Sequence, residues 1–230
     1  MNFSINHTAL LLFSRSAGEE SLHKKLLKGK RTNYHLAATF ISRSKKIAKE
    51  SKLPLFIYTE KEQTGSSFGE KIHDSVSSIF DQGFENVIII GNDCLQLSAQ
   101  HILAAAGELN FHDQVFAPTK KGGVSIIGLK KSTFSSEFQN VRWQTELTFQ
   151  DLCELAGKNK FSVGHLPLLD DINDSNELIH YLKNSSAFDR FSILLLSIVS
   201  SYTHKLPRNV SLISFNFLCS SSFRGPPVAG

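Results

Sequence analysis

An aspartate near the middle of the chain stands where carboxylates in α/β proteins commonly do chemistry. Residues 87–90 are apolar at every position, and Gly91, Asn92 and Asp93 follow them. Such a run is typical of a strand buried on both faces, as in a parallel sheet covered by helices. Ligands bind beyond the carboxyl ends of these strands. Asp93 is therefore a candidate ligand for a divalent cation that also contacts a phosphate, although an aspartate here could instead cap the next helix.

Basic residues and a glycine follow the first predicted strand, residues 8–13. Arg15, Gly18 and Lys25 occupy the position of a phosphate-binding loop. Phosphates in proteins are bound by cationic side chains and backbone N–H groups, so these residues are candidates for that role. The spacing is neither that of a P-loop nor that of the dinucleotide-binding glycine motif.

The composition restricts the class of protein. The chain has 230 residues, 41% of them hydrophobic and 20% charged, as expected for a globular α/β domain with an appendage. A net charge of +4 is too weak to indicate nucleic-acid binding but is compatible with an anionic substrate. Three scattered cysteines argue against disulfides or structural zinc. No secretory signal is evident and the late apolar run 193–199 is too short to cross a membrane, so we expect a cytoplasmic protein without a membrane span.

The hydrophobic periodicity predicts alternating strands and helices. Strands are expected at 8–13, 54–58, 87–91, 114–117 and 124–129, with an extended segment at 161–169. Helices are expected at 33–51, 68–80, 99–109, 145–156 and 175–182, with Ser98 and Ser175 as N-caps and polar loops at 14–21 and 63–67. This order predicts an α/β fold, a three-layer α/β/α sandwich with a mixed sheet that has some antiparallel edge strands.

The pattern weakens after residue 184. We expect residues 1–185 to form one nucleotide-binding domain and residues 186–230 to form a C-terminal extension. Within the extension, the sequence predicts a helix at 188–202, an edge strand at 210–218 and a tail at 220–230.

Four segments together resemble one known family. They are Phe13-Ser14-Arg15 with His23-Lys24-Lys25-Leu26, Gln63-Thr64-Gly65 with Phe68-Gly69-Glu70-Lys71, Ile90-Gly91-Asn92-Asp93-Cys94, and residues 122–129. Their order and spacing are similar to those of the radical-SAM/selenodomain-associated transferase family. The resemblance covers roughly residues 8–182. It implies the Rossmann-like GT-A fold of nucleotide-diphospho-sugar transferases.

The resemblance also implies a nucleotide-activated donor, bound with Mg²⁺ or Mn²⁺ in a site lined by basic residues. Asp93 is the first expected metal ligand, and Asp171 and Asn173 are second choices that could instead be turn residues. Asp93 and Lys121 are the expected catalytic residues. The expected donor-binding residues are Arg15, Gly18, Lys25, Gln63, Gly65, Glu70, Gly122 and Gly123.

Lys121 departs from the family pattern, which usually has Asp before the paired glycines. A reversal of charge beside a phosphate and a metal changes the electrostatic energy by several kcal/mol at roughly 4 Å and intermediate dielectric. Lys121 could contact the diphosphate directly, or it could mark a site that has lost activity. Leu95, His23 and Asn173 are further departures.

Three functions remain open from the sequence. The first is glycosyl transfer from a nucleotide-sugar to an unknown acceptor. The second is nucleotidyl transfer, similar to that of guanylyltransferases, from a nucleoside triphosphate to a phosphorylated small molecule. The third is a catalytically degenerate nucleotide-binding or scaffold protein. The sequence indicates neither the acceptor nor the oligomeric state.

Overall fold

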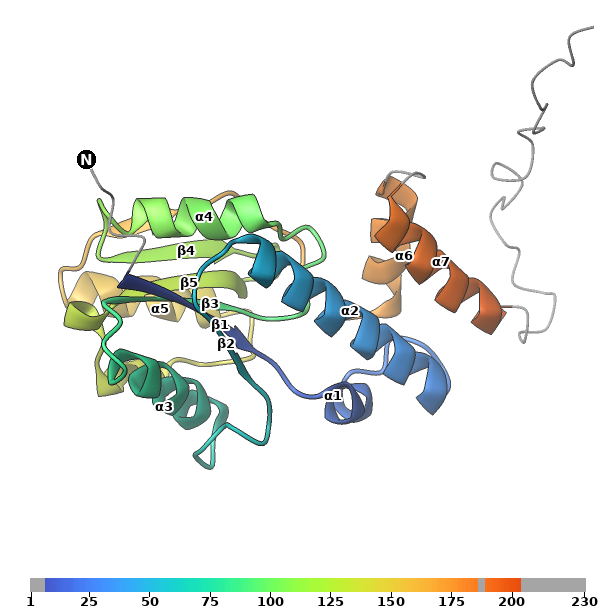
Figure 1. Cartoon of the computed structure of the whole chain (residues 1–230), viewed down its shortest axis with the longest axis horizontal. Coiled ribbons are helices and arrows are strands. Elements are labelled where there is room, and N and C mark those ends of the chain that lie inside the picture. The colour runs from blue at the N-terminus through green and yellow to red at the C-terminus, as the bar shows by residue number, and fades with distance from the viewer. Residues whose placement is uncertain (1–6, 186–188, 204–230) are drawn as a thin grey trace, which may run out of the picture.

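Three parallel strands form one half of the sheet (Figure 1). The structure, a computed structural model, describes residues 7–185 and 189–203. Strand β1 (Thr8–Phe13) pairs in parallel with β2 (Leu55–Tyr58) on one side and with β3 (Asn86–Ile90) on the other. All residues of β1 are buried, as the apolar run that follows Thr8 predicts. The carboxyl ends of the three strands therefore lie at the same edge of the sheet.

The other half contains the single reversal of direction among the described strands. Strand β5 (Val124–Lys130) is antiparallel to β3 and to β4 (Gln114–Pro118), and β6 (Val163–His165) is parallel to β4. The full order is β2-β1-β3-β5-β4-β6. The sheet is mixed, as predicted, but the antiparallel strand is internal and was wrongly expected at an edge. Because the connection after β4 is short, the chain turns back and β5 pairs with β4 in the antiparallel direction. The five central residues of β5 are buried.

Helices cover both faces of the sheet. Helices α2 (Lys30–Glu50) and α4 (Ala99–Glu108) contribute to one apolar cluster with the sheet. Helices α3 (Phe68–Phe80) and α5 (Thr148–Lys158) contribute to a second cluster. The two clusters take alternate side chains of each strand, because successive strand residues point to opposite faces. This confirms the predicted three-layer α/β/α architecture.

Two further helices pack away from the sheet, beside α2 (Figure 1). They are α6 (Ser175–Asn184) and α7 (Arg190–Thr203), and they bury Leu178 and Leu195 against Phe40 of α2. Helix α7 overlaps the predicted helix at 188–202. The predicted strand at 210–218 and the tail at 220–230 lie outside the described residues, and the domain boundary at 185 stays a prediction. Within the described ranges, no helix combines the length and hydropathy needed to cross a membrane.

Two local predictions are wrong. The expected polar loop at 14–21 contains helix α1 (Ala17–His23), which is capped by the side chain of Ser16. It escapes detection because it is short and has no apolar periodicity. Helix α6 is capped by Asp174, and Ser175 is its first residue. The Asp174 carboxylate accepts two backbone hydrogen bonds, which makes it the stronger cap of the two.

Candidate functional site

A cavity of about 900 Å³ opens at the carboxyl ends of β1 and β3. Its walls come from helix α1, the first turn of α3, the amino end of β5, and the segments 143–148 and 171–173. Seven of the residues selected from the sequence line it: Arg15, Gln63, Asp93, Lys121, Gly123, Asp171 and Asn173. The location agrees with the rule that ligands of open α/β sheets bind beyond the strand ends.

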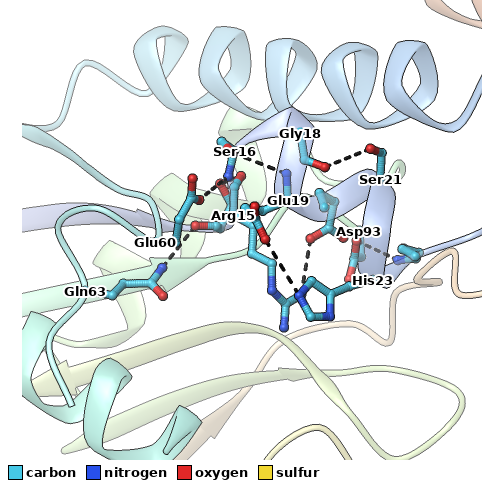
Figure 2. A network of polar contacts seen from close by, with 12 residues as sticks. Arg15, Ser16, Gly18, Glu19, Ser21, His23, Glu60, Gln63 and Asp93 are labelled. Atoms are coloured by element: carbon cyan, nitrogen blue, oxygen red, sulfur yellow. Dashed lines mark hydrogen bonds and ion pairs between the residues drawn. The ribbon is translucent and has the colours of Figure 1, made fainter. Parts of the chain in front are cut away.

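One wall is held together by polar contacts around Arg15 (Figure 2). The guanidinium Nη1 of Arg15 lies 3.3 Å from Oε2 of Glu20, which is buried. The backbone N–H of Ser16 donates to Oε2 of Glu60 at 2.7 Å. Burial raises the pKa of Glu60, but the hydrogen bonds from Ser16 outweigh it and leave the pKa below its ordinary value. Helix α1 is thereby fixed to the segment after β2.

Gln63 joins the ends of two strands. Its side-chain Nε2 donates to the carbonyl oxygen of Ser14 at 3.0 Å and to that of Tyr58 at 3.2 Å. These carbonyls belong to the segment after β1 and to the last residue of β2. The amide of Gln63 therefore has a structural use in addition to its place in the cavity wall.

Asp93 forms an ion pair within the protein. The ammonium Nζ of Lys24 lies 2.6 Å from its Oδ1. Both atoms are inaccessible to solvent, and their alignment is too poor for a hydrogen bond, so the contact is electrostatic. Asp93 caps none of the described helices, and α4 begins at its cap Ser98. The alternative of a helix cap is therefore wrong, but the partner of the carboxylate is Lys24, which the sequence analysis did not select.

The segment 171–173 lies against the Asp93 loop. The backbone N–H of Ile172 donates to the carbonyl oxygen of Asp93 at 2.9 Å. The side-chain Nδ2 of Asn173 donates to Oδ2 of Asp171 at 2.8 Å. The three expected metal ligands are thus neighbours in space.

Lys121 is engaged elsewhere. Its ammonium group contacts the carboxylates of Glu177 and Asp174, in the first turn and at the cap of α6. The hydrogen bond to Glu177 is the main reason that the pKa of Lys121 is raised. Lys121 reaches the cavity wall, but its charge is already compensated. This arrangement differs from the expected free ammonium that contacts a diphosphate.

Two of the expected donor-binding glycines pack against protein backbone or side chains outside the cavity. Gly122 has φ 79°, and a Cβ added there would lie 1.8 Å from the carbonyl oxygen of Glu146. Gly65 has φ 104°, and a Cβ there would lie 2.7 Å from the Cβ of Glu70. Gly18 lies in α1 with an ordinary φ and open space around it. None of the three lines the cavity.

Glu70 and Lys25 do not reach the cavity either. The carboxylate of Glu70 completes the capping box of α3 and accepts from Ser66 and Ser67. Its pKa is lowered by these hydrogen bonds, with that from the Ser66 side chain the largest cause. Lys25 is exposed. The motif at 68–71 contributes Phe68 and Lys71 to the cavity wall, and the motif at 23–26 contributes His23 to the wall and Lys24 as the partner of Asp93.

Of the residues at the site that were not selected from the sequence, three carry polar groups that matter for binding. Lys71 lines the cavity, and within the described chain its ammonium has no carboxylate partner. Asn92 is only 6% exposed and lines the cavity, and its Nδ2 has no hydrogen-bond partner among the described residues. The third, Lys24, is described above. The capping box of Ser67 and Glu70 is visible in the sequence, and it indicates that Glu70 has a structural use at the start of α3, where Lys71 follows it.

The cavity is more acidic than expected. Its acidic residues are Glu19, Glu20, Glu60, Asp93, Glu146 and Asp171, and its basic residues are Arg15, Lys71 and Lys121. The expectation of a site lined by basic residues is wrong. Several of these carboxylates are, however, compensated by partners on the chain, so Lys71 is the cation most available to an anion.

A preformed site for a divalent cation is not found in the part of the chain that the structure describes. No group of three His, Cys, Asp or Glu side chains there has a metal-binding arrangement. Asp93 is paired with Lys24, and Asp171 accepts from Asn173. Mg²⁺ is commonly bound by only one or two protein carboxylates beside waters and substrate phosphates. The misfit of the expected Mg²⁺ or Mn²⁺ ion therefore rests on the ammonium group of Lys24, which already occupies one oxygen of Asp93.

A second cavity, of about 970 Å³, adjoins the first. It lies between α2, α6 and the segment after β3, and it shares Lys121 and Asp171 with the first cavity. Arg43 of α2 stands in its wall, donating to the carbonyl oxygen of Leu95 and lying 4.5 Å from the ring centroid of Phe191. Asp171 therefore borders both cavities.

Comparisons with known proteins agree with this fold. The family described as "Uncharacterized protein conserved in bacteria (DUF2064)" matches residues 27–145. The crystal structure of a "putative nucleotide-diphospho-sugar transferase" from Desulfovibrio desulfuricans G20 has a TM-score of 0.73 at 19% identity, over 85% of this chain and 98% of that chain. No curated protein sequence matches the chain.

Two more remote structural matches are a synthase and a complex with manganese. The 4-diphosphocytidyl-2C-methyl-D-erythritol synthase of Anaerococcus prevotii DSM 20548 has a TM-score of 0.49 at 9% identity, over 79% of this chain and 98% of that one. Rv0371c of Mycobacterium tuberculosis H37Rv, in complex with manganese, has a TM-score of 0.47 at 9% identity, over 78% of this chain and 100% of that one. At such identities the similarity concerns the fold alone.

Proposed function

The chain belongs to the DUF2064 family, and from this premise we propose that it is a transferase that uses a nucleotide-activated donor, with glycosyl transfer from a nucleotide-sugar as the reaction. The observation that carries the proposal is the cavity at the ends of β1 and β3, in a fold shared with a nucleotide-diphospho-sugar transferase. The donor would occupy this cavity and the acceptor would enter through the adjoining one.

Two cations would hold the diphosphate of the donor. Lys71 has no carboxylate partner among the described residues, and only one guanidinium nitrogen of Arg15 contacts Glu20. Charge-assisted hydrogen bonds to phosphate are about twice as strong as neutral ones. As the bond to the leaving diphosphate breaks, negative charge develops on its oxygen, and the same cations would stabilise that charge.

The side chain of Asn92 would bind a polar group of the donor. Its Nδ2 is buried and finds no partner in the part of the chain that the structure describes, and an unsatisfied buried donor costs roughly 1–3 kcal/mol. A ligand acceptor atom in the cavity would remove that penalty.

Asp171 would act as the general base. It lines both cavities, so a hydroxyl of the acceptor could transfer its proton to the Asp171 carboxylate while its oxygen attacks the donor. Gly123 stands beside Asp171, where the absence of a side chain leaves the backbone open to the sugar.

The test is a thermal-shift and calorimetric screen of nucleotide-sugars and nucleoside triphosphates. A ligand at 100 times its Kd stabilises the protein by about 2.7 kcal/mol, so high ligand concentrations are needed. Lys71→Ala should weaken binding by about 1.5–3 kcal/mol, and Lys49→Ala, an exposed lysine of α2, should not. Equal binding by wild type and Lys71→Ala would contradict the proposed site.

The released product identifies the reaction. Nucleoside diphosphate release indicates glycosyl transfer, and pyrophosphate release from a triphosphate would indicate nucleotidyl transfer instead. Asp171→Asn should retain donor binding and lose turnover. Donor binding without release of either product, with a range of acceptors, would indicate a nucleotide-binding protein that is not an enzyme.

A further inference from the structure

We propose that the ammonium group of Lys24 replaces a divalent cation at Asp93, so that this site takes its phosphate-bearing donor without a metal ion there. The identity of the donor rests on the function proposed above. The exclusion of metal from Asp93 rests on the geometry of Lys24 and is tested separately from it.

The ammonium of Lys24 is held in place by the fold. Lys24 is the C-terminal cap of α1, and its backbone N–H donates to the carbonyl oxygen of Glu20 at 2.8 Å. Helix α1 is in turn fixed by the contact of Ser16 with Glu60. The Lys24 side chain is only 14% exposed, and its Nζ is buried at 2.6 Å from Oδ1 of Asp93. Lys24 is therefore unlike a surface lysine with a mobile, hydrated end.

Electrostatics favours this pair over a metal ion. A buried charge is tolerated only with a partner, and Lys24 and Asp93 supply each other with one. A divalent cation at the same carboxylate would lie within a few ångströms of a fixed positive charge, where repulsion in a partly buried site is poorly screened by salt. The Asp93 side chain is 40% exposed, so the rest of the carboxylate stays open to the cavity but is subject to that repulsion.

Three neighbouring carboxylates are partly engaged as well. Glu20 contacts Arg15, Glu60 accepts from the backbone of Ser16, and Asp171 accepts from Asn173, each through one oxygen. A metal ion that used one of them as a second ligand would share it with a partner already on the chain. The cation that compensates Asp93 is thus built into the chain.

The deciding experiment titrates Mn²⁺ alone into the whole protein, without nucleotide, and follows free Mn²⁺ by electron paramagnetic resonance. The variant Lys24→Met removes the charge and keeps a long apolar side chain, and Lys28→Met, an exposed lysine nearby, is the matched control. Lys24→Met should bind Mn²⁺ more than about tenfold tighter than wild type, and Lys28→Met should not differ. This gain in Mn²⁺ affinity should disappear in the double variant Lys24→Met/Asp93→Asn.

Two further measurements keep the inference falsifiable if Lys24→Met fails to fold. Lys24→Arg retains a cation and should bind Mn²⁺ as poorly as wild type. If instead wild type binds Mn²⁺ and Asp93→Asn abolishes that binding, Asp93 is a metal ligand and the inference is overturned. A Lys24→Met variant that folds and gains no Mn²⁺ affinity would overturn it as well.

The proposed function is checked in a separate arm with inorganic pyrophosphate as the probe. Wild type should bind pyrophosphate in the presence of a chelator, because its cations come from the chain. Binding that appears only with Mn²⁺ would overturn the inference. Absence of binding under both conditions would count against the proposed function, while the titration of Mn²⁺ alone still decides the role of Lys24.

Discussion

Two physical effects coincide at Gly122, a backbone conformation that favours glycine and a lack of space for a side chain. Alanine substitutions at four glycines separate these two effects. Its φ is 79°, and a Cβ added there would lie 1.8 Å from the carbonyl oxygen of Glu146. Gly83 has φ 94° with nothing within 4 Å of an added Cβ, so it reports the conformational effect alone. A left-handed conformation costs about 1–2 kcal/mol for a residue with a Cβ, and Gly83→Ala should lose that much stability.

The other two glycines complete the set. Gly69 has an ordinary φ, but a Cβ there would lie 2.0 Å from the carbonyl oxygen of Gln139. Overpacking costs about 1–3 kcal/mol, and the better helix propensity of alanine returns up to ~1 kcal/mol of this in α3. Gly18 has neither feature, so Gly18→Ala should be neutral or gain up to ~1 kcal/mol in α1.

Gly122→Ala combines both effects, and we expect a loss of about 2–5 kcal/mol. The assay is urea denaturation followed by circular dichroism, with the midpoint and the slope of the free energy compared across the four variants. If Gly122→Ala is no less stable than Gly83→Ala, the 143–148 segment is not packed on Gly122 as described. The role of Gly122 would then be the one expected from the sequence, an open backbone for the ligand.

Three smaller predictions follow from caps, ion pairs and burial. Ser67→Ala removes the side-chain cap of α3 and should lower the free energy of unfolding by about 1 kcal/mol in urea denaturation; an unchanged midpoint would contradict the capping role. Hydrogen bonds from Arg142 lower the pKa of Asp151, so its stabilisation is present above the unfolded pKa of about 3.9 and is lost as the pH falls through the folded value. The stability difference between wild type and Asp151→Asn, measured by denaturation from pH 7 down to about 2, should therefore vanish at the acid end, and a constant difference would contradict it. Burial raises the pKa of Cys94 to about 11, so native protein treated with iodoacetamide near pH 8 should be alkylated at the less buried Cys153 before Cys94, as read by peptide mass spectrometry.

The fold was predictable because its strands are buried on both faces. The runs at 9–13 and 87–90 are apolar at every position, which restricts them to the interior of a sheet covered by helices. The direction of β5 and its place in the sheet were less predictable from the sequence. An internal strand of seven residues has the same apolar sequence whether its neighbours are parallel or antiparallel, so only the pairing with β3 and β4 reveals the reversal.

The site was predictable in its location and less so in its residues. Asp93 was selected because its place after a buried strand is visible in the sequence. Lys24 and Lys25 are adjacent and identical in type, and only the end of helix α1, which has no sequence periodicity, decides which of them turns inward. The ion pairs of Lys121 were not foreseen for a similar reason, because its partners at the cap and in the first turn of α6 are more than fifty positions away in the chain.

The central place of β1 in the sheet affects how the chain can fold while it is being synthesised. Leu10 has Leu55 as its partner on one side and Ile88 on the other, so both neighbours are made later than β1 itself. At a synthesis rate of roughly 5–20 residues per second, this strand waits several seconds with both edges unpaired. An apolar strand with free edges can associate with other chains. Of the described strands, β1 is the one that the nascent protein must protect longest from aggregation.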